Sequence, residues 1–278
     1  GDGNMGGYGD GVAYYFQYQK GLVSMKLNGK EYLSGPVKPD FYRALTDNDE
    51  GAGYGQSAGI WMSAGHYAAI KSWDHGTNED GSIWMKYVYG IPFVNLEAEL
   101  TYTVYGDGYV SVNLEMDTSE NTPLLPAFGM RFLLKGELNE VSWLGKGPQE
   151  TYCDRDHART DVYSSSVADQ FTTYLRPQEC GNHMGTYKGT LSCSCGCALT
   201  FEAEGTPLQF SALPWTPEQI ALANHPYELP ESHKTIVRVL SEQMGVGGDD
   251  TWGAPVHDEW LIKTGGRLTC RFGFHPGK

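Results

Sequence analysis

Hydrophobic and polar residues alternate with a period of two along much of the chain, which is the pattern of half-buried β-strands. The clearest case is residues 96–104, where apolar residues at the even positions alternate with Glu and Thr. A Gly106-Asp107-Gly108 turn follows, and the alternation resumes over residues 110–116. Two alternating runs joined by a glycine-containing turn predict a β-hairpin.

A second hairpin is predicted around Asn28-Gly29, which separates two short alternating runs at residues 23–27 and 30–33. Asn-Gly is the preferred pair of a type I′ turn, because both central residues need positive φ. Further strands are predicted at residues 130–134, 198–203, 208–213, 235–240, 259–263 and 268–274.

One stretch predicts a helix. Thr216 suits the N-cap, Pro217 suits the first helical position and Gln219 completes a capping box. Apolar residues continue to Ala223, and a His-Pro pair then ends the helix. Many strands with one short helix predict an all-β fold built as a large antiparallel sandwich.

The domain organisation follows from the same pattern. No repeat or composition shift divides residues 13–278, so we expect one sandwich domain there. Residues 1–12 are rich in glycine and lack the basic and apolar regions of a signal peptide, so we expect a flexible linker or a cut end. The compartment stays open; a cytoplasmic location is favoured over a periplasmic one.

Charge and composition restrict the partners. The chain has 278 residues, of which 34 are acidic and 20 are basic, for a net charge of −14. Without a Lys/Arg cluster, nucleic acid and anionic membranes are poor partners. Aromatic residues make up 13% of the chain, with 18 Tyr and 7 Trp, which suits both strands and carbohydrate surfaces. A neutral ligand is the simpler expectation.

Three of the six cysteines, Cys193, Cys195 and Cys197, are spaced by one residue. In an extended strand their side chains would share one face. A zinc site needs pairs of closely spaced cysteines, and only Cys180 and His183 come near that requirement. We therefore expect no metal site, but small, reduced side chains on a packed strand face.

The most informative loop is Met244–Trp252, which carries several glycines, two carboxylates and a terminal tryptophan. Glycines permit positive φ, and Asp249 and Asp250 can hydrogen-bond backbone amides and hold the turn. Trp252 would then be presented as a stacking platform for the apolar face of a sugar. The alternative is a structural loop whose tryptophan fills a gap in the core.

A second polar cluster, Asp47-Asn48-Asp49, is the nearest approach to the carboxylate pair that a glycosidase needs. Asp and Asn residues shortly before a glycine, here Gly51, are also common in structural turns, and Arg43 can pair with one of the carboxylates. We interpret Arg43, Asp47, Asn48 and Asp49 as loop-structural residues.

Two further segments, residues 143–155 and 174–183, mix glycine, proline, carboxylate, amide and aromatic side chains. Such mixtures suit sugar hydroxyls and suit well-bonded loops between strands equally. The sequence has no nucleophile elbow, P-loop or dinucleotide-binding fingerprint, and its histidines are scattered.

Four segments, taken together and in this order, resemble the C-terminal domain of bacterial β-galactosidases of glycoside hydrolase family 2. They are residues 43–49, 143–152, 174–179 and 244–252. In some members this domain is a separate small subunit. The resemblance covers nearly the whole chain. It implies a large antiparallel supersandwich similar to galactose mutarotase.

The resemblance also implies what this chain lacks. In that family the catalytic glutamates and the magnesium and sodium sites lie in a separate TIM-barrel domain. We therefore expect no catalytic residue, cofactor or metal in this chain, and Glu150 and Glu179 are not catalysts. The expected partners are a β-galactoside or galactose, a catalytic barrel of the same or another chain, and further copies in a possible homo-oligomer.

Two loops are expected to reach the active site of the full enzyme. Trp252 matches the family tryptophan that stacks on the sugar, and Gly51 matches the start of a mobile loop, although the residues after Gly51 depart from the family pattern. With Asp249 and Asp250, these form the expected substrate-binding set.

The expected function is that of a non-catalytic domain in an enzyme that hydrolyses terminal β-galactosides, with the isolated chain inactive. The alternatives are an autonomous carbohydrate-binding module and a mutarotase-like enzyme. The latter would use Glu179 or Asp249 with His157 or His183.

Overall fold

The computed structural model describes residues 4–9, 11–250 and 253–277, which form antiparallel sheets with a few short helices. The strands are β1 (Asn4–Gly9), β2 (Val12–Gln17), β3 (Gly21–Leu27), β4 (Lys30–Glu31), β5 (Lys38–Asp40), β6 (Ala69–Thr77), β7 (Ile83–Ile91), β8 (Leu96–Val104), β9 (Val110–Asp117), β10 (Ala127–Lys135), β11 (Glu140–Gly147), β12 (Arg159–Ser166), β13 (His183–Thr186), β14 (Lys188–Ser192), β15 (Ala198–Ala203), β16 (Leu208–Leu213), β17 (Lys234–Gln243) and β18 (Arg267–Gly277). The helices are α1 (Asp47–Gly51), α2 (Tyr54–Ser57), α3 (Ile60–His66) and α4 (Pro217–Leu222), with 3-10 turns η1 (Ala168–Gln170), η2 (Pro226–Glu228) and η3 (Asp258–Trp260).

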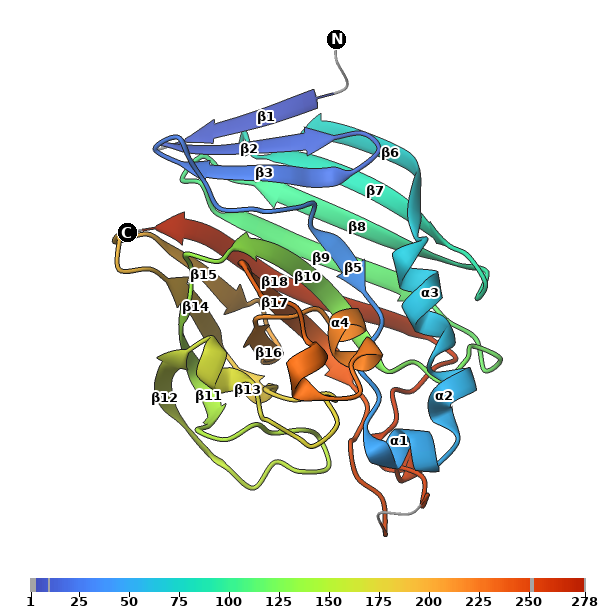
Figure 1. Ribbon diagram of the computed structural model, residues 1–278. Helices are drawn as coiled ribbons and strands as arrows, with labels where there is room; N and C mark the ends of the chain where they lie inside the picture. Colours follow the sequence, from blue (N-terminus) through green and yellow to red (C-terminus); the bar gives the residue numbers. More distant parts are fainter. Residues whose placement is uncertain (1–3, 10, 251–252, 278) are drawn as a thin grey trace.

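The strands form three sheets. The largest has nine strands in the order β12-β11-β14-β15-β18-β9-β8-β7-β6, and a five-stranded sheet has the order β13-β16-β17-β10-β5. A four-stranded sheet, β1-β2-β3-β4, lies near the β6–β9 end of the large sheet, and α1, α2 and α3 follow one another along one end of the molecule (Figure 1). The predicted all-β, antiparallel supersandwich is confirmed.

The core between the sheets is rich in aromatic side chains. Phe132 of β10 is fully buried and makes an edge-to-face contact with Phe201 of β15, their ring centroids 4.9 Å apart. It makes similar contacts with Phe272 and Phe274 of β18 at 6.1 and 5.4 Å. Phe132 therefore joins the five-stranded sheet to the nine-stranded sheet, and its burial removes a large apolar area from water.

Both predicted hairpins and the predicted helix are present. Strands β8 and β9 pair as expected, and Asn28 and Gly29 have φ values of 50° and 82° between β3 and β4. Helix α4 begins with the predicted capping box, in which the Thr216 hydroxyl accepts a hydrogen bond from the backbone N–H of Gln219 at 3.2 Å.

The structure corrects one predicted strand. Residues 259–263 were predicted to be extended, but Asp258–Trp260 form the 3-10 turn η3. The Trp260 carbonyl accepts a hydrogen bond from the Gly245 N–H at 2.8 Å, so this segment bonds to a loop and not to a neighbouring strand. Residues Asn4–Gly9, in the expected linker, pair along their length with β2 as strand β1.

Helices α1, α2 and α3 were not predicted, and the expected Asp47–Asp49 turn is the first turn of α1. The signal for α1 was present in the sequence. The Thr46 hydroxyl accepts from the backbone N–H of Asp49, and the Asp49 carboxylate accepts from the N–H of Thr46, which is a capping box. Among the described residues, no helix has the length and apolar character required to cross a membrane.

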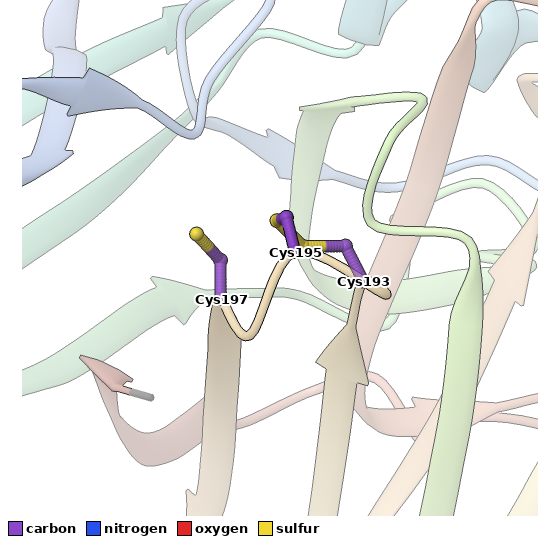
Figure 2. Close-up of side chains that lie close together, drawn as sticks. All are labelled: Cys193, Cys195 and Cys197. Atoms are coloured by element: carbon purple, nitrogen blue, oxygen red, sulfur yellow. A yellow bond between two sulfur atoms is a disulfide. The ribbon is translucent and has the colours of Figure 1, made fainter.

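The three closely spaced cysteines lie at the tip of the β14–β15 hairpin, and not along a strand face as expected. The Gly196 N–H donates to the Cys193 carbonyl at 3.1 Å, and Gly196 has a φ of 83°. The chain therefore turns within the Cys193–Cys197 segment, where strand alternation does not apply. Cys193 and Cys195 form a disulfide where reduced thiols were expected, and Cys197 is free (Figure 2).

We predict that Phe132→Ala lowers the free energy of unfolding by about 3–5 kcal/mol, because it leaves a cavity between two sheets. Leu175→Ala is the control, since Leu175 is 96% exposed and its truncation removes almost no buried area. Urea unfolding followed by circular dichroism measures both. Equal losses in the two variants would contradict the assigned position of Phe132 in the core.

Candidate functional site

The four sequence segments that resemble the β-galactosidase domain meet in one polar cluster. Residues 43–49 run into α1, residues 143–152 begin in the second half of β11, residues 174–179 precede β13, and residues 244–250 follow β17; the first neighbours of two of these segments, up to residues 155 and 183, belong to the same cluster. Although far apart in the sequence, the four segments are joined by the hydrogen bonds described below. Helix α1 and the chain that follows β17 lie side by side at one end of the molecule (Figure 1).

The first link is the fully buried Arg43 side chain. Its Nη2 donates to both carboxylate oxygens of Asp49, at 3.0 and 2.9 Å. The same guanidinium donates to the carbonyl of Met244 at 2.6 Å and to that of Gly245 at 2.8 Å. Arg43 therefore fixes the start of the glycine-rich loop against the N-terminus of α1.

Asp49 is equally buried, and the Arg43–Asp49 pair has no access to water. The pair is compensated because Asp49 also accepts the Thr46 N–H at 2.9 Å, which satisfies an otherwise free helix amide. Arg43 thus pairs with one carboxylate of the Asp47-Asn48-Asp49 cluster, and the loop-structural role of these residues stays a prediction.

Asp47 links α1 to a second segment. Its backbone N–H donates to Gln178 Oε1 at 3.1 Å, and its carboxylate accepts from Gln178 Nε2 at 3.0 Å. Asp47 therefore holds the 174–183 segment in place, whereas Asp49 is bound to Arg43. Asn48 lies between them, and its carbonyl accepts the α1 C-cap N–H of Ala52 at 2.8 Å.

The glycine-rich loop is held from its other side by Asp154. One carboxylate oxygen of Asp154 accepts hydrogen bonds from the N–H groups of Val246 and Gly247, at 2.9 and 2.7 Å. A side chain on Gly245 would lie only 2.7 Å from the same oxygen, so glycine is required there for the close approach.

Glu150 ties together the remaining parts. Its carboxylate accepts from the Tyr174 hydroxyl at 2.5 Å, the Gly181 N–H at 2.7 Å and the Arg155 guanidinium at 2.5 Å. Such a carboxylate, surrounded by donors, acts as an anchor between loops.

The predicted substrate-binding residues lie in the loop beyond this anchor. Asp250 accepts from the N–H groups of Gly253 and Ala254, both at 3.1 Å, and so holds the turn as expected. Asp249 instead pairs with His257, with Oδ1 and Nε2 2.8 Å apart. Trp252 lies outside the described residues.

The two loops that are expected to reach a substrate are adjacent. A side chain at Gly253, whose φ is 138°, would lie 2.6 Å from the carbonyl oxygen of Gly51. The structure thus brings Gly51 beside the loop that carries Asp249 and Asp250. Whether these residues bind substrate stays a prediction.

A polar cleft of about 650 Å³ adjoins this cluster. Its lining includes Glu150, Asp154, Arg155 and His183, which come from the two segments with sugar-compatible composition, and His157, which follows the first of them. Another cleft, of about 640 Å³, lies near α4 between Arg131 and His233 and shares none of these segments. Both clefts have similar volumes and both are lined by charged and polar side chains, so we select the first because Glu150 and Asp154, which anchor the loops, line it.

Two of the residues considered for mutarotase chemistry are unsuited to proton transfer with a substrate. Glu179 is 5% exposed, and its carboxylate accepts from Arg238 Nη1 at 3.1 Å. His183 is 2% exposed, lies against the Trp143 ring with centroids 3.9 Å apart, and has its pKa lowered to about 4 by burial. Both residues therefore support the packing of the cluster.

The carboxylates of the cluster accept hydrogen bonds from N–H, O–H or guanidinium groups. In the part of the chain that the structure describes, one group of three or more His, Cys, Asp or Glu ligands has its donor atoms mutually within 4.8 Å. That group is Cys193, Cys195 and Cys197, at the hairpin tip.

Sequence reasoning missed the positioning roles of Asp154 and Glu150. Both lie in segments that were noted for their composition, but nothing local indicates that their partners are 92 and 31 residues away. The available signal was a carboxylate beside glycine- and proline-rich loops, which need acceptors for unpaired amides.

Comparison with known proteins shows similarity in sequence and in fold. The family described as "Beta galactosidase small chain" matches residues 8–274. A β-galactosidase from Streptococcus thermophilus is 39% identical over 279 residues, which cover 99% of this chain and 27% of that protein. A β-galactosidase small subunit from Latilactobacillus sakei is 30% identical, and the match covers 94% of this chain and 92% of the subunit.

Among solved structures, a galactose mutarotase-related enzyme from Lactobacillus acidophilus has a TM-score of 0.52 and 8% sequence identity. The match covers 99% of this chain and 97% of that one. This likeness confirms the mutarotase-like fold. The chain spans about a quarter of the length of the first two β-galactosidases that it matches, at 27% and 26%.

We predict that Asp154→Ala weakens the attachment of the glycine-rich loop. The backbone N–H groups of Val246 and Gly247 lose a charged hydrogen-bond acceptor. A hydrogen bond to a charged group contributes about 1.5–3 kcal/mol to stability, so hydrogen exchange at these two amides should accelerate at least tenfold. Asp156→Ala is the control, because Asp156 pairs with Lys146 and not with the loop. Unchanged protection of both amides in Asp154→Ala would contradict the anchor.

We also predict that the order of this loop depends on pH. The hydrogen bond and charge of Asp249 raise the pKa of His257 above its ordinary value of 6.5. The pair's contribution to stability is therefore fully present below pH 6.5 and is lost as the pH rises through the folded pKa. In Asp249→Asn the His257 pKa, measured by NMR titration, should fall toward 6.5. A His257 pKa that stays elevated would exclude Asp249 as its partner.

Proposed function

This chain belongs to the β-galactosidase small-chain family, and on that basis we propose that it is the non-catalytic domain of an enzyme that hydrolyses terminal β-galactosides. The catalytic groups, and the magnesium and sodium sites that the resemblance implies, would belong to a TIM barrel in the same or a partner chain. In this proposal the domain supplies a wall of the sugar site. The isolated chain would be inactive.

The observation that carries the proposal is the convergence of four separated segments on one loop. Arg43 holds the start of the glycine-rich loop, Asp154 holds its next two amides, and Glu150 holds the segment that carries Asp154. A structure that served packing alone would not need three charged anchors around an exposed loop, since each anchor carries a desolvation cost. The arrangement favours a loop whose position matters to a ligand.

The ligand-contacting group in this proposal is Trp252, which follows Asp250 in the sequence. An indole ring offers an apolar face to the C–H groups of a galactoside, and Asp250 orders the turn beside it. Gly51, adjacent to Gly253, would form part of the same wall.

A second candidate function is an autonomous carbohydrate-binding module. The specific observation in its favour is the 650 Å³ cleft, where Arg155, His157 and the loop carboxylates offer donors and acceptors without a partner chain. This candidate requires that the isolated chain bind sugar, whereas the first does not.

We predict that Trp252→Ala raises the KM of the assembled enzyme for β-galactosides by about fivefold, which corresponds to a stacking contribution on the order of 1 kcal/mol. Trp73→Ala is the matched control, because Trp73 is a partly exposed tryptophan on β6, distant in sequence from the loop. Steady-state kinetics with several aglycones measure the change. A KM that is unchanged across those aglycones would refute the stacking role.

Titration of the isolated chain with galactose and lactose separates the two candidates. Tryptophan fluorescence and calorimetry would report no saturable binding if Trp252 acts only beside a docked barrel. Millimolar or tighter binding that survives Trp252→Ala but is lost in Arg155→Ala would favour the autonomous module and its cleft.

A further inference from the structure

The cysteines at the tip of the β14–β15 hairpin have no part in the proposed galactosidase function, yet they form a compact set of sulfur ligands. The Sγ atoms of Cys193, Cys195 and Cys197 all lie within 4.8 Å of one another. Figure 2 shows the three side chains extending from the same end of the hairpin, with the Cys193–Cys195 disulfide beside the free Cys197 thiol.

The backbone holds this group together without help from the side chains. The Cys193 N–H donates to the Cys197 carbonyl at 3.0 Å, and the Gly196 N–H donates back to the Cys193 carbonyl at 3.1 Å. Cys193 and Cys197 therefore close the turn from opposite strands, and Cys195 lies between them at its tip. A three-residue turn with glycine in the left-handed region is a stable hairpin connection, so the ligands are preorganised.

The spacing of the sulfurs suits one small thiophilic ion. Metal–thiolate bonds of about 2.3 Å in a trigonal plane place the sulfur atoms about 4 Å apart. All three sulfurs already lie within 4.8 Å of one another, so after reduction the Cys193 and Cys195 sulfurs need only move apart from bonding distance by a rotation of their side chains. Thiolates alone select soft ions, and three ligands match the low coordination number of Cu(I) better than the tetrahedral preference of Zn(II).

We propose that Cys193, Cys195 and Cys197, once the Cys193–Cys195 disulfide is reduced, bind one Cu(I) ion as a trigonal thiolate site. The disulfide and the ion exclude each other, because both use the same two sulfurs. The hairpin tip is therefore a metal site that is gated by the thiol redox state of its surroundings.

The chemistry balances with a small-molecule thiol as reductant. Two thiol molecules transfer two electrons and two protons to the Cys193–Cys195 bond, which gives two cysteine thiols and one small-molecule disulfide. The three cysteine thiols then bind Cu(I) and release three protons, which leaves a complex with a net charge of −2.

A nearby cation offsets that negative charge. Lys30 Nζ lies 3.1 Å from Cys195 Sγ, and such a neighbour favours the thiolate form. Glu137 is 3.2 Å from the same Nζ and keeps the lysine directed toward the hairpin. On the inner side, the Tyr32 hydroxyl donates to the Gly277 carbonyl at 3.3 Å, and Gly277 pairs with Ala198 at the base of the hairpin tip.

The test is a competition titration of the full chain under anaerobic conditions. The chain is reduced with a phosphine, six free thiols are verified, and Cu(I) is titrated against bicinchoninate. We expect one equivalent of Cu(I) to bind per chain. The oxidised chain, which retains the disulfide, should leave the copper with the competitor.

The variants separate this site from the other cysteines. Loss of a residue that binds the metal directly lowers metal affinity by more than the roughly 10–100-fold that is typical for loss of a residue hydrogen-bonded to a ligand. Cys195→Ser should therefore weaken Cu(I) binding at least about 100-fold. The matched control is Cys153→Ser, which removes a partly buried thiol outside the hairpin and should leave binding unchanged.

Two results would overturn the proposal. In the first, the reduced wild-type chain binds no more Cu(I) than the Cys193→Ser/Cys195→Ser/Cys197→Ser variant, while identical circular dichroism spectra show that both chains are folded. The second is tighter binding of Zn(II) than of Cu(I) under matched competition, which would contradict the trigonal monovalent site.

Discussion

A single buried guanidinium, that of Arg43, connects parts of the chain that are about 200 residues apart. It donates to a carboxylate within α1 and to two consecutive carbonyls where β17 ends. Removing one member of a buried ion pair costs roughly 3–5 kcal/mol, because the other member is left charged and unsolvated. The position of the glycine-rich loop relative to α1 therefore depends on Arg43 and Asp49 together, and neither can change alone.

The other anchors extend this constraint through the cluster. Asp154 uses one oxygen for two loop amides, which keeps the Gly245–Gly247 backbone in place where glycine allows the carboxylate to approach. Glu150 then fixes the 174–183 segment, and Asp47 attaches that segment back to α1. The four segments thus form a closed circuit of charged hydrogen bonds. In a closed circuit, displacement of any one segment strains bonds in the others, so the loop is positioned more firmly than its glycine content suggests.

How much of the fold and of the candidate site could be predicted from the sequence depends on how far apart in the chain the interacting residues are. Period-two alternation and Asn28-Gly29 are local, and the strands and turns they predict are present. Strand β7 was missed because its two faces are both largely apolar, which hides the alternation. The 259–263 segment was mistaken for a strand because its hydrogen-bonding partner is a loop. The cysteines were placed on a strand face because Gly196 was not recognised as the left-handed residue of a turn.

In the candidate site, too, contacts between residues that are close in the sequence could be predicted and those between distant residues could not. The pairing of Arg43 with a nearby carboxylate can be expected from the sequence because Asp49 is only six residues away, whereas the contacts of Asp154 with Val246 and of Glu150 with Gly181 are created only by the fold.

The mutarotase-like fold does not by itself bring mutarotase chemistry, because function depends on particular exposed groups. Here Glu179 is buried against Arg238, and His183 is held neutral beneath Trp143. These acidic and basic groups are used to stabilise the base of the loop cluster, where exclusion of water strengthens each hydrogen bond. Glu179 and His183 are therefore packed and hydrogen-bonded inside the domain, Glu179 against Tyr152 and Arg238 and His183 against Trp143 and Gln170, and neither is an exposed reacting group.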